Sequence, residues 1–121
     1  MKYSKLIRDR IPEIIAKTGK TVSYRILNEE EFKNALEEKL DEEVIEFHES
    51  KSAEEIADIL EVVNAIIKAN GYHRITVFKE RMKKKIFKGG FRRRAFLEAV
   101  EGDDEEAQLI ESQEECEKAA E

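Results

Sequence analysis

The strongest constraint on the fold of this chain is a pair of long amphipathic segments separated by only two residues. In the first segment, Asn28 and Glu31 have the spacing of a capping box, and Leu27 and Phe32 have that of a hydrophobic staple. These signals predict a helix that begins near Asn28 and ends at about Ser50. Its apolar residues recur with helical spacing on one face: Phe32, Leu36, Leu40, Val44 and Phe47.

The second segment opens with Ser52 and Glu55, which again have capping-box spacing, and it stops at Asn70 and Gly71. Its apolar residues also follow a helical period: Ile56, Ile59, Leu60, Val63, Ile66 and Ile67. Because only Lys51 and Ser52 join the two segments, the helices have to pack against each other in antiparallel directions. The sequence therefore predicts a helical hairpin.

Additional elements are predicted on both sides of the hairpin. Pro12 suits the first turn of a short helix, which Gly19 can end in a left-handed conformation. Residues 21–26 alternate between polar and apolar side chains, which predicts a half-buried extended segment. Thr76 can cap a third long helix that ends at Gly89 and carries an apolar face of Phe78, Met82 and Ile86.

Composition favours an all-α protein. The 121 residues include one proline and five glycines, and 7% are aromatic, which favours helices over a turn-rich sandwich or barrel. At this length we expect a single helical domain over residues 1–100, followed by an acidic C-terminal tail over residues 101–121. Cys116 is the single cysteine, which excludes an intrachain disulfide and a cysteine-based zinc cluster. With neither a membrane-length apolar stretch nor a signal-peptide block, we expect a cytoplasmic protein that makes no membrane contact.

Charge is distributed unevenly along the chain, whose net charge is −6. Residues 29–61 carry fourteen acids and three lysines, whereas residues 79–94 carry nine bases and one acid. A basic run of this kind can bind phosphates, but the acidic centre and tail repel a polyanion, which argues against a nucleic-acid partner. A non-catalytic helical module that binds nucleic acid or protein through residues 79–94 is the alternative from another functional class.

Four acidic residues of the hairpin are placed toward its interior. At about 100° per residue, Glu43 falls within the apolar stripe of its helix, and Glu46 falls at the edge. In the next helix Glu55 falls among apolar residues, and Asp58 lies one turn further on at the edge. Counting outward from Lys51 brings Glu46 level with Glu55, and Glu43 level with Asp58. With helix axes roughly 8 to 10 Å apart, the four carboxylates can converge on one centre.

Four such anions repel one another unless a cation neutralises them. Ligation by oxygen alone points to Mg²⁺, with Mn²⁺ as the alternative, because the hairpin offers neither cysteine nor paired histidines. The competing interpretation is that the acids line solvated helix faces and that Glu55 only completes the capping box of Ser52. Spacing alone therefore predicts a metal site of unspecified chemistry.

The pattern Glu43-x-x-Glu46, followed by Glu55-x-x-Asp58, resembles the signature of the all-α nucleoside triphosphate pyrophosphohydrolases. This MazG-like superfamily includes phosphoribosyl-ATP pyrophosphohydrolase. Two other stretches look like the opening and the ending of a small stand-alone branch of it: Lys5-Leu6-Ile7-Arg8-Asp9-Arg10-Ile11-Pro12-Glu13-Ile14-Ile15 and Gly89-Gly90-Phe91. Together these stretches cover residues 3–97.

The resemblance implies Mg²⁺-dependent hydrolysis of a nucleotide between its α and β phosphates, which releases a monophosphate and pyrophosphate and often clears non-standard nucleotides. Hydrolysis of phosphoribosyl-ATP in histidine biosynthesis is the alternative enzyme activity. The implied metal ligands are Glu43, Glu46, Glu55 and Asp58. The implied catalytic residues are Glu42, Glu43 and Glu46, of which Glu42 matches a commonly acidic family position and would order or deprotonate the attacking water.

Basic residues have to neutralise the pyrophosphate as it leaves, because guanidinium pairs with phosphate bidentately and lysine acts as a point charge. Two sets are candidates: Lys5, Arg8 and Arg10, or Lys83, Lys84 and Arg92. Of these we favour Lys5 and Arg8.

Both hairpin helices have apolar arcs wider than one neighbouring helix can cover. We therefore expect two hairpins to join into a four-helix-bundle core on oligomerisation. Members of the family that the chain resembles assemble as dimers or tetramers, which implies a homodimer or homotetramer.

Overall fold

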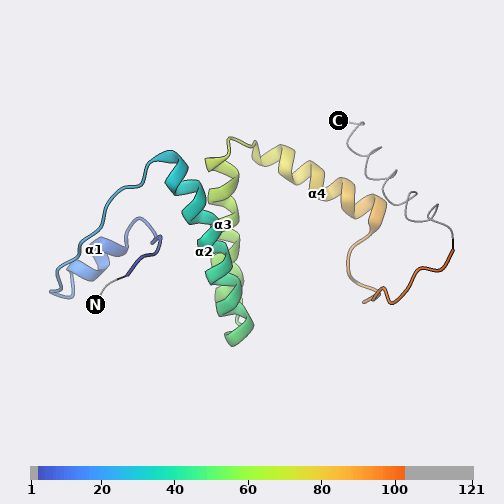
Figure 1. The fold of residues 1–121 in the computed structure, drawn as a ribbon, viewed down its shortest axis with the longest axis horizontal. Coiled ribbons are helices and arrows are strands. Elements are labelled where there is room, and N and C mark those ends of the chain that lie inside the picture. Colours follow the sequence, from blue (N-terminus) through green and yellow to red (C-terminus); the bar gives the residue numbers. More distant parts are fainter. Residues whose placement is uncertain (1–2, 103–121) are drawn as a thin grey trace. The chain divides into compact units, whose positions relative to one another are not determined.

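The computed structural model describes residues 3–102 of the chain. Within this range the protein contains four helices and no strand: α1 (Ile11–Ala16), α2 (Glu29–Ser50), α3 (Ala53–Ala69) and α4 (Arg74–Lys88) (Figure 1). The expected all-α class is therefore confirmed for the described residues. None of their helices combines the length and the apolar character that a membrane span requires. The chain divides into two units, one up to Arg74 and one from Ile75 onward.

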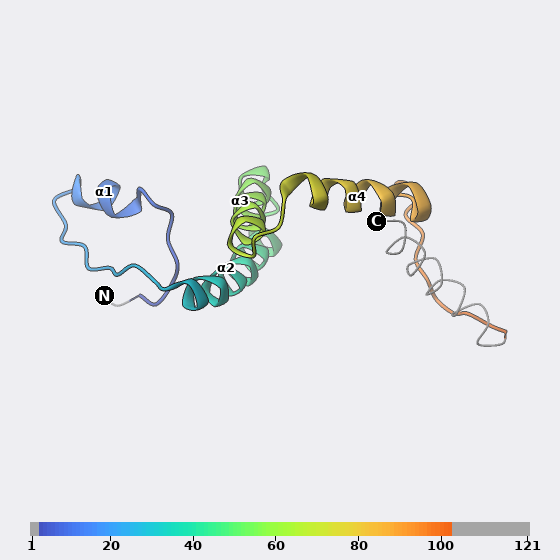
Figure 2. The ribbon, with the colours of Figure 1, turned by 90° about the horizontal axis from the view of Figure 1, so that it is seen from above.

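Helices α2 and α3 lie side by side and run in opposite directions (Figures 1 and 2), which confirms the predicted hairpin. The start of α2 carries a complete capping box. Asn28 Oδ1 accepts a 2.9 Å hydrogen bond from the backbone N–H of Glu31, and Glu31 Oε1 accepts a 3.3 Å bond from the backbone N–H of Asn28. Two of the four N–H groups that a helix start leaves without partners are thereby satisfied, so α2 begins where the sequence predicts.

The link between α2 and α3 reverses the chain within two residues. Lys51 adopts a left-handed conformation, with φ 55°, and its backbone N–H donates to Phe47 O at 2.8 Å. Ser52 then caps α3, because its hydroxyl accepts a 3.4 Å bond from the backbone N–H of Glu55. At the other end of α3 the backbone turns at Gly71, with φ 73°.

The interior of the hairpin is small. Leu36 of α2 and Val62 of α3 are the buried apolar side chains among the described residues. Several apolar side chains of the same two helices are exposed: Ile45, Ile56 and Leu60. Leu60 retains 63% of its accessible surface, so the apolar arc of α3 extends beyond the area that α2 covers.

In the segment before the hairpin, the predicted short helix is confirmed, and the half-burial predicted for residues 21–26 is wrong at Tyr24 and Ile26. Helix α1 forms with Pro12 in its first turn, and Gly19 follows it with φ 85°. The extended segment predicted over residues 21–26 forms no strand. A strand requires a neighbouring strand for its backbone hydrogen bonds, and residues 3–102 provide none. Tyr24 and Ile26 are accordingly exposed, not half-buried.

In the second unit, the prediction that Thr76 caps the long basic helix is wrong. Helix α4 already begins at Arg74, so Thr76 lies inside its first turn, whereas a capping residue has to keep a non-helical backbone. The predicted end is confirmed, because α4 stops at Lys88 and Gly89 follows with φ 82°. The predicted acidic tail lies outside the described residues from position 103 onward, and so does Cys116.

Candidate metal centre

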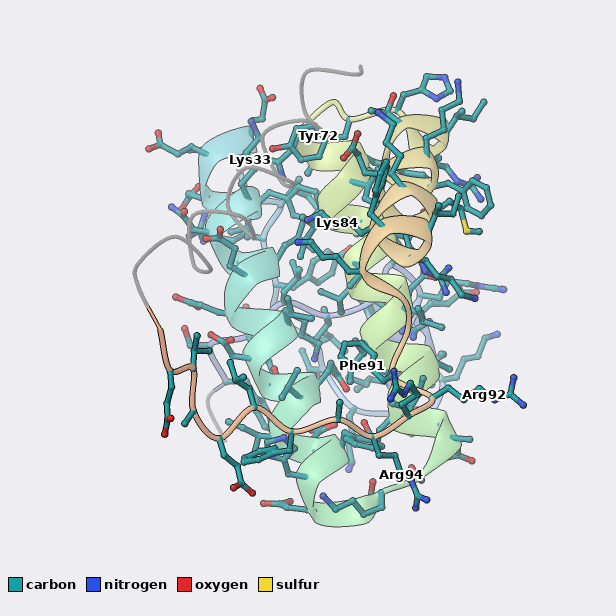
Figure 3. The ribbon with its side chains drawn as sticks, turned by 90° about the vertical axis from the view of Figure 1, so that its right-hand side faces the viewer. Lys33, Tyr72, Lys84, Phe91, Arg92 and Arg94 are labelled. Atoms are coloured by element: carbon teal, nitrogen blue, oxygen red, sulfur yellow. The ribbon has the colours of Figure 1, made fainter. Side chains whose placement is uncertain are left out.

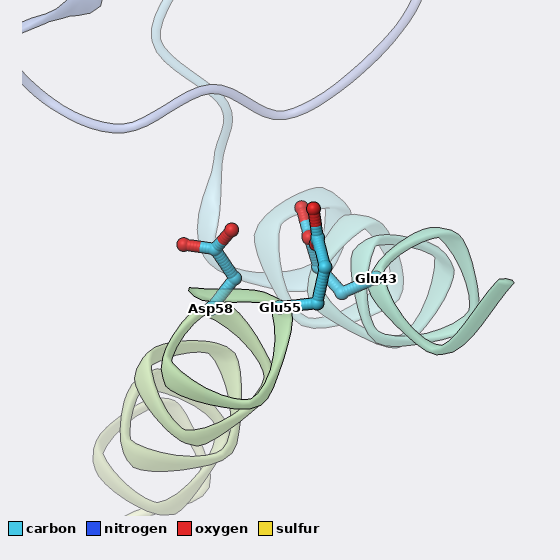
Figure 4. A group of neighbouring side chains, drawn as sticks. All are labelled: Glu43, Glu55 and Asp58. Carbon is cyan, nitrogen blue, oxygen red and sulfur yellow. The ribbon is translucent and has the colours of Figure 1, made fainter. Parts of the chain in front are cut away.

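Three acidic side chains from the two hairpin helices meet on one side of the hairpin. Glu43 of α2 and Glu55 and Asp58 of α3 each offer a carboxylate oxygen, and these oxygens all lie within 4.8 Å of one another. Figure 4 shows the three carboxyl groups pointing to the same side of the helix pair. Glu43 is also buried, with 6% of its surface exposed, as its place in the apolar stripe predicts.

Two of the oxygens in this group are buried without a hydrogen-bond partner: Oε2 of Glu43 and Oε2 of Glu55. A buried carboxylate oxygen ordinarily has a donor or a cation beside it, because removing a charge from water without compensation is costly. The side chain of Glu43 is only 7% exposed. The two unpartnered oxygens are thus sheltered from solvent on carboxylates that lie beside other acids, and a metal ion would satisfy such an environment.

The carboxyl group of Glu55 holds its proton more tightly than a free glutamate does. Burial is the main cause that raises the pKa of Glu55, to about 7, and the negative charge of Glu46 is the next. The close approach of Glu43 and the charge of Asp58 act in the same direction. The cluster therefore holds more negative charge than its own surroundings stabilise.

Glu46 lies beside this group but is not part of its tight core. The sequence predicts that Glu46 lies opposite Glu55 across the hairpin, and the negative charge of Glu46 does act on Glu55. Glu46 is nevertheless not among the three residues whose oxygens lie within 4.8 Å of one another. Glu43 approaches both Glu55 and Asp58. The structure therefore brings three of the four predicted ligands together and leaves Glu46 at the edge.

Lys39 is a site residue that the sequence reasoning missed. Its Nζ lies 3.3 Å from Oε1 of Glu42 and 3.2 Å from Oε1 of Glu43, and its side chain is only 16% exposed. Burial alone would lower the pKa of Lys39, but hydrogen bonds to Glu43 and Glu42 raise it. The signal was present in the sequence, because residues three and four apart on a helix are neighbours.

The N-terminal segment before α1 brings two basic residues to the acids. Nη2 of Arg8 donates a 2.7 Å hydrogen bond to Oδ1 of Asp58, across 50 positions of sequence. Nζ of Lys5 lies 3.7 Å from Oε1 of Glu42. Of the two favoured candidates for phosphate binding, Arg8 therefore contacts one of the three clustered acids, and Lys5 lies near Glu42, the residue before Glu43.

The remaining basic candidates have other surroundings. Arg10 pairs with Glu13, at 3.7 Å, in the first turn of α1. Lys83 lies 3.7 Å from Glu80 of its own helix, in the unit that begins at Ile75. Arg92 belongs to the same unit and is exposed, and its side chain extends away from the ribbon (Figure 3). A role for Lys83 and Arg92 in phosphate binding stays a prediction.

No family model matches the chain, and no solved structure matches it. An uncharacterized protein of Mycolicibacterium smegmatis is 51% identical to it over 43 residues. The match covers 36% of this chain and 44% of the relative, so the chain spans less than half of the length of the relative. The likeness is therefore local.

Proposed function

We propose that this protein is a Mg²⁺-dependent nucleotide pyrophosphohydrolase of the MazG-like type, which cleaves a nucleoside triphosphate between its α and β phosphates. The observation that carries the proposal is the meeting of Glu43, Glu55 and Asp58, with sheltered Oε2 atoms on both glutamates that accept no hydrogen bond. Phosphoribosyl-ATP is the alternative substrate.

The donor set fits a hard divalent cation. Oxygen atoms from three carboxylates are the ligands that Mg²⁺ and Mn²⁺ prefer, and such ions keep waters or substrate phosphates in their remaining positions. Glu43, Glu55 and Asp58 would hold the ion, and Glu46 would join them or add its charge. When bound, such an ion polarises phosphate oxygens and makes a bound water more acidic.

The basic side chains around the cluster support a role in phosphate binding. Arg8 and Lys5 reach the acids from the N-terminal segment, where their positive charges can stabilise the pyrophosphate leaving group. Lys39 pairs with Oε1 of Glu43, whereas Oε2 of the same carboxylate is buried and has no hydrogen-bond partner. Oε1 of Glu42 pairs with both Lys39 and Lys5. The Glu42 carboxylate can therefore orient these two lysines in addition to an attacking water.

The exposed apolar residues of the hairpin support assembly. Ile45, Ile56 and Leu60 are exposed on a hairpin that buries only Leu36 and Val62 among the described apolar side chains. Pairing of two hairpins into a four-helix bundle would cover such surface, and a symmetric dimer is the smallest closed assembly that does so.

The test is release of pyrophosphate from a panel of nucleotides that includes phosphoribosyl-ATP, measured as phosphate after addition of an inorganic pyrophosphatase, with Mg²⁺ and with EDTA. We expect Mg²⁺-dependent release from at least one nucleotide and none from Asp58→Asn. Absence of release from every nucleotide, or unchanged turnover in Asp58→Asn, contradicts the proposal.

A non-catalytic role is the second candidate, favoured by the exposed basic side chains of Lys79, Arg81, Lys84 and Lys85 on α4. This function predicts binding of nucleic acid or of an acidic protein that weakens steeply with salt. Because the acidic cluster plays no part in it, Asp58→Asn would leave such binding unchanged.

A further inference from the structure

Arg8 contacts the acidic cluster of Glu43, Glu55 and Asp58 from outside the hairpin. Its guanidinium donates to Asp58, one of the three acids whose oxygens meet. The Arg8 side chain is 57% exposed, so it is held by this contact and not by packing. Helix α1 follows only three residues later, and the segment that carries Arg8 has no regular secondary structure. Arg8 can therefore change partner without any loss of helix.

A guanidinium and a divalent ion compete at Asp58. Both seek lone pairs of the same carboxylate, and two positive charges within a few ångström repel each other. The presence of Arg8 should therefore weaken the binding of a divalent ion on its own. Oxygens of a di- or triphosphate are better partners for Arg8 than one carboxylate, because they carry more charge and match the planar guanidinium bidentately.

We propose that Arg8 is a shared cation that pairs with Asp58 until an ion and a polyphosphate bind together, and then moves to the polyphosphate. This inference rests on the proposed function. It makes the site selective for the metal–polyphosphate complex over the free ion. Reciprocity of binding free energies then requires that metal and polyphosphate strengthen each other's binding.

The experiment measures, by isothermal titration calorimetry, the affinity of the full-length protein for Mn²⁺ alone and for the preformed one-to-one complex of Mn²⁺ with pyrophosphate. In Arg8→Gln we expect binding of Mn²⁺ alone to tighten by about fivefold, because the competing charge is gone and exposed charges interact modestly. We expect the Mn²⁺–pyrophosphate complex to bind more weakly in the same variant. Opposite changes in two affinities are a result that general loss of structure does not produce.

Arg25→Gln is the matched control. Nη2 of Arg25 donates to Oε2 of Glu31 at 2.8 Å, so this substitution also breaks one exposed pair of arginine and carboxylate. Glu31 precedes Glu43 by twelve positions on α2, or about 18 Å of helix. We expect both affinities of Arg25→Gln to equal those of the unmodified protein.

The alternative role of Arg8 is to orient Asp58 for the metal. In that case Arg8→Gln would weaken or leave unchanged the binding of Mn²⁺ alone, and either result overturns the shared-cation proposal while the metal site stands. Parallel changes in Arg25→Gln overturn it as well. If neither the unmodified protein nor Arg8→Gln binds Mn²⁺, the proposed function fails together with this inference.

Discussion

Glu31 and Glu55 occupy the same position of the same sequence motif, and the structure uses them in opposite ways. Each lies three residues after a helix-capping residue, Asn28 or Ser52. Glu31 completes its capping box and binds Arg25. The hydrogen bond from Arg25 is the main cause that lowers the pKa of Glu31, and the bond from the backbone N–H of Asn28 is the next. Glu55 leaves its box incomplete and joins the acidic cluster, where burial and neighbouring charge raise its pKa to about 7.

The local reason for this difference is a serine that lies two residues before the second cap. The hydroxyl of Ser50 accepts a 3.3 Å hydrogen bond from the backbone N–H of Ser52. In a complete capping box, the Glu55 carboxylate would accept a hydrogen bond from this same N–H. Because Ser50 takes that role, the Glu55 carboxylate is available to the cluster. The interpretation of Glu55 as only a capping residue is therefore wrong.

The largest expected difference between the two glutamates is in activity. We expect Glu55→Gln to lose turnover by at least about 100-fold, since even residues behind metal ligands cost about 10- to 100-fold when they are replaced. Glu31→Gln should retain turnover and lower the melting temperature by a few degrees, because it weakens the start of α2. Steady-state pyrophosphate release and thermal melts measure both. Equal loss of activity in the two variants would contradict the separation of their roles.

Without substrate, the effect of Mg²⁺ on the melting temperature should distinguish Glu55 from Glu31. A ligand that binds only the folded state stabilises it by about 2.7 kcal/mol at 100 times its Kd. We expect Mg²⁺ to raise the melting temperature of the unmodified protein and of Glu31→Gln, and EDTA to reverse the effect. Glu55→Gln should show little change with Mg²⁺, and an equal rise in all three proteins would place the ion elsewhere.

Stability should depend on pH with opposite signs at the two glutamates. The folded protein holds the Glu55 proton more tightly than the unfolded chain does, so its contribution is complete below about pH 4.5 and is lost as pH rises through about 7. The advantage of the unmodified protein over Glu55→Gln should therefore shrink across this range in EDTA. Glu31 behaves in the opposite way, because its lowered pKa gives a contribution that is present above pH 4.5 and is lost on acidification. Melts from pH 4 to 8 check both signs.

The smallest expected difference concerns the two caps. Asn28→Ala removes a 2.9 Å hydrogen bond of a complete box and should cost about 1 kcal/mol of unfolding free energy. Ser52→Ala removes a 3.4 Å bond and should cost less. Urea unfolding measures both values, and a larger loss in Ser52→Ala would mean that the second cap also positions Glu55.

Much of the hairpin follows from local sequence. The capping residues Asn28 and Ser52 and the turn at Gly71 act within a few residues of themselves, so spacing alone locates the ends of α2 and the start and end of α3. The inward direction of Glu43 also follows, because helical geometry relates it directly to the apolar stripe.

Other features depend on contacts between distant parts of the chain. The pairing of Arg8 with Asp58 spans 50 positions, and no local pattern identifies the partner of an exposed arginine. The half-burial that the alternation over residues 21–26 predicts is wrong at Tyr24 and Ile26, because burial of an extended segment depends on what packs against it, which periodicity within one segment does not report. Lys39 was overlooked because a lysine among many acids resembles an ordinary solvated ion pair until its burial is known.

The two-residue link at Lys51 and Ser52 has a consequence for how this chain tolerates change in length. Each residue of a helix advances the axis by about 1.5 Å and turns it by about 100°. An insertion at the tip of the hairpin would therefore alter which residues of α2 and α3 face each other, although every acidic residue would still be present. Surface loops ordinarily tolerate changes in length. The link at Lys51 and Ser52 differs, because its length decides whether the carboxylates of α2 and α3 meet.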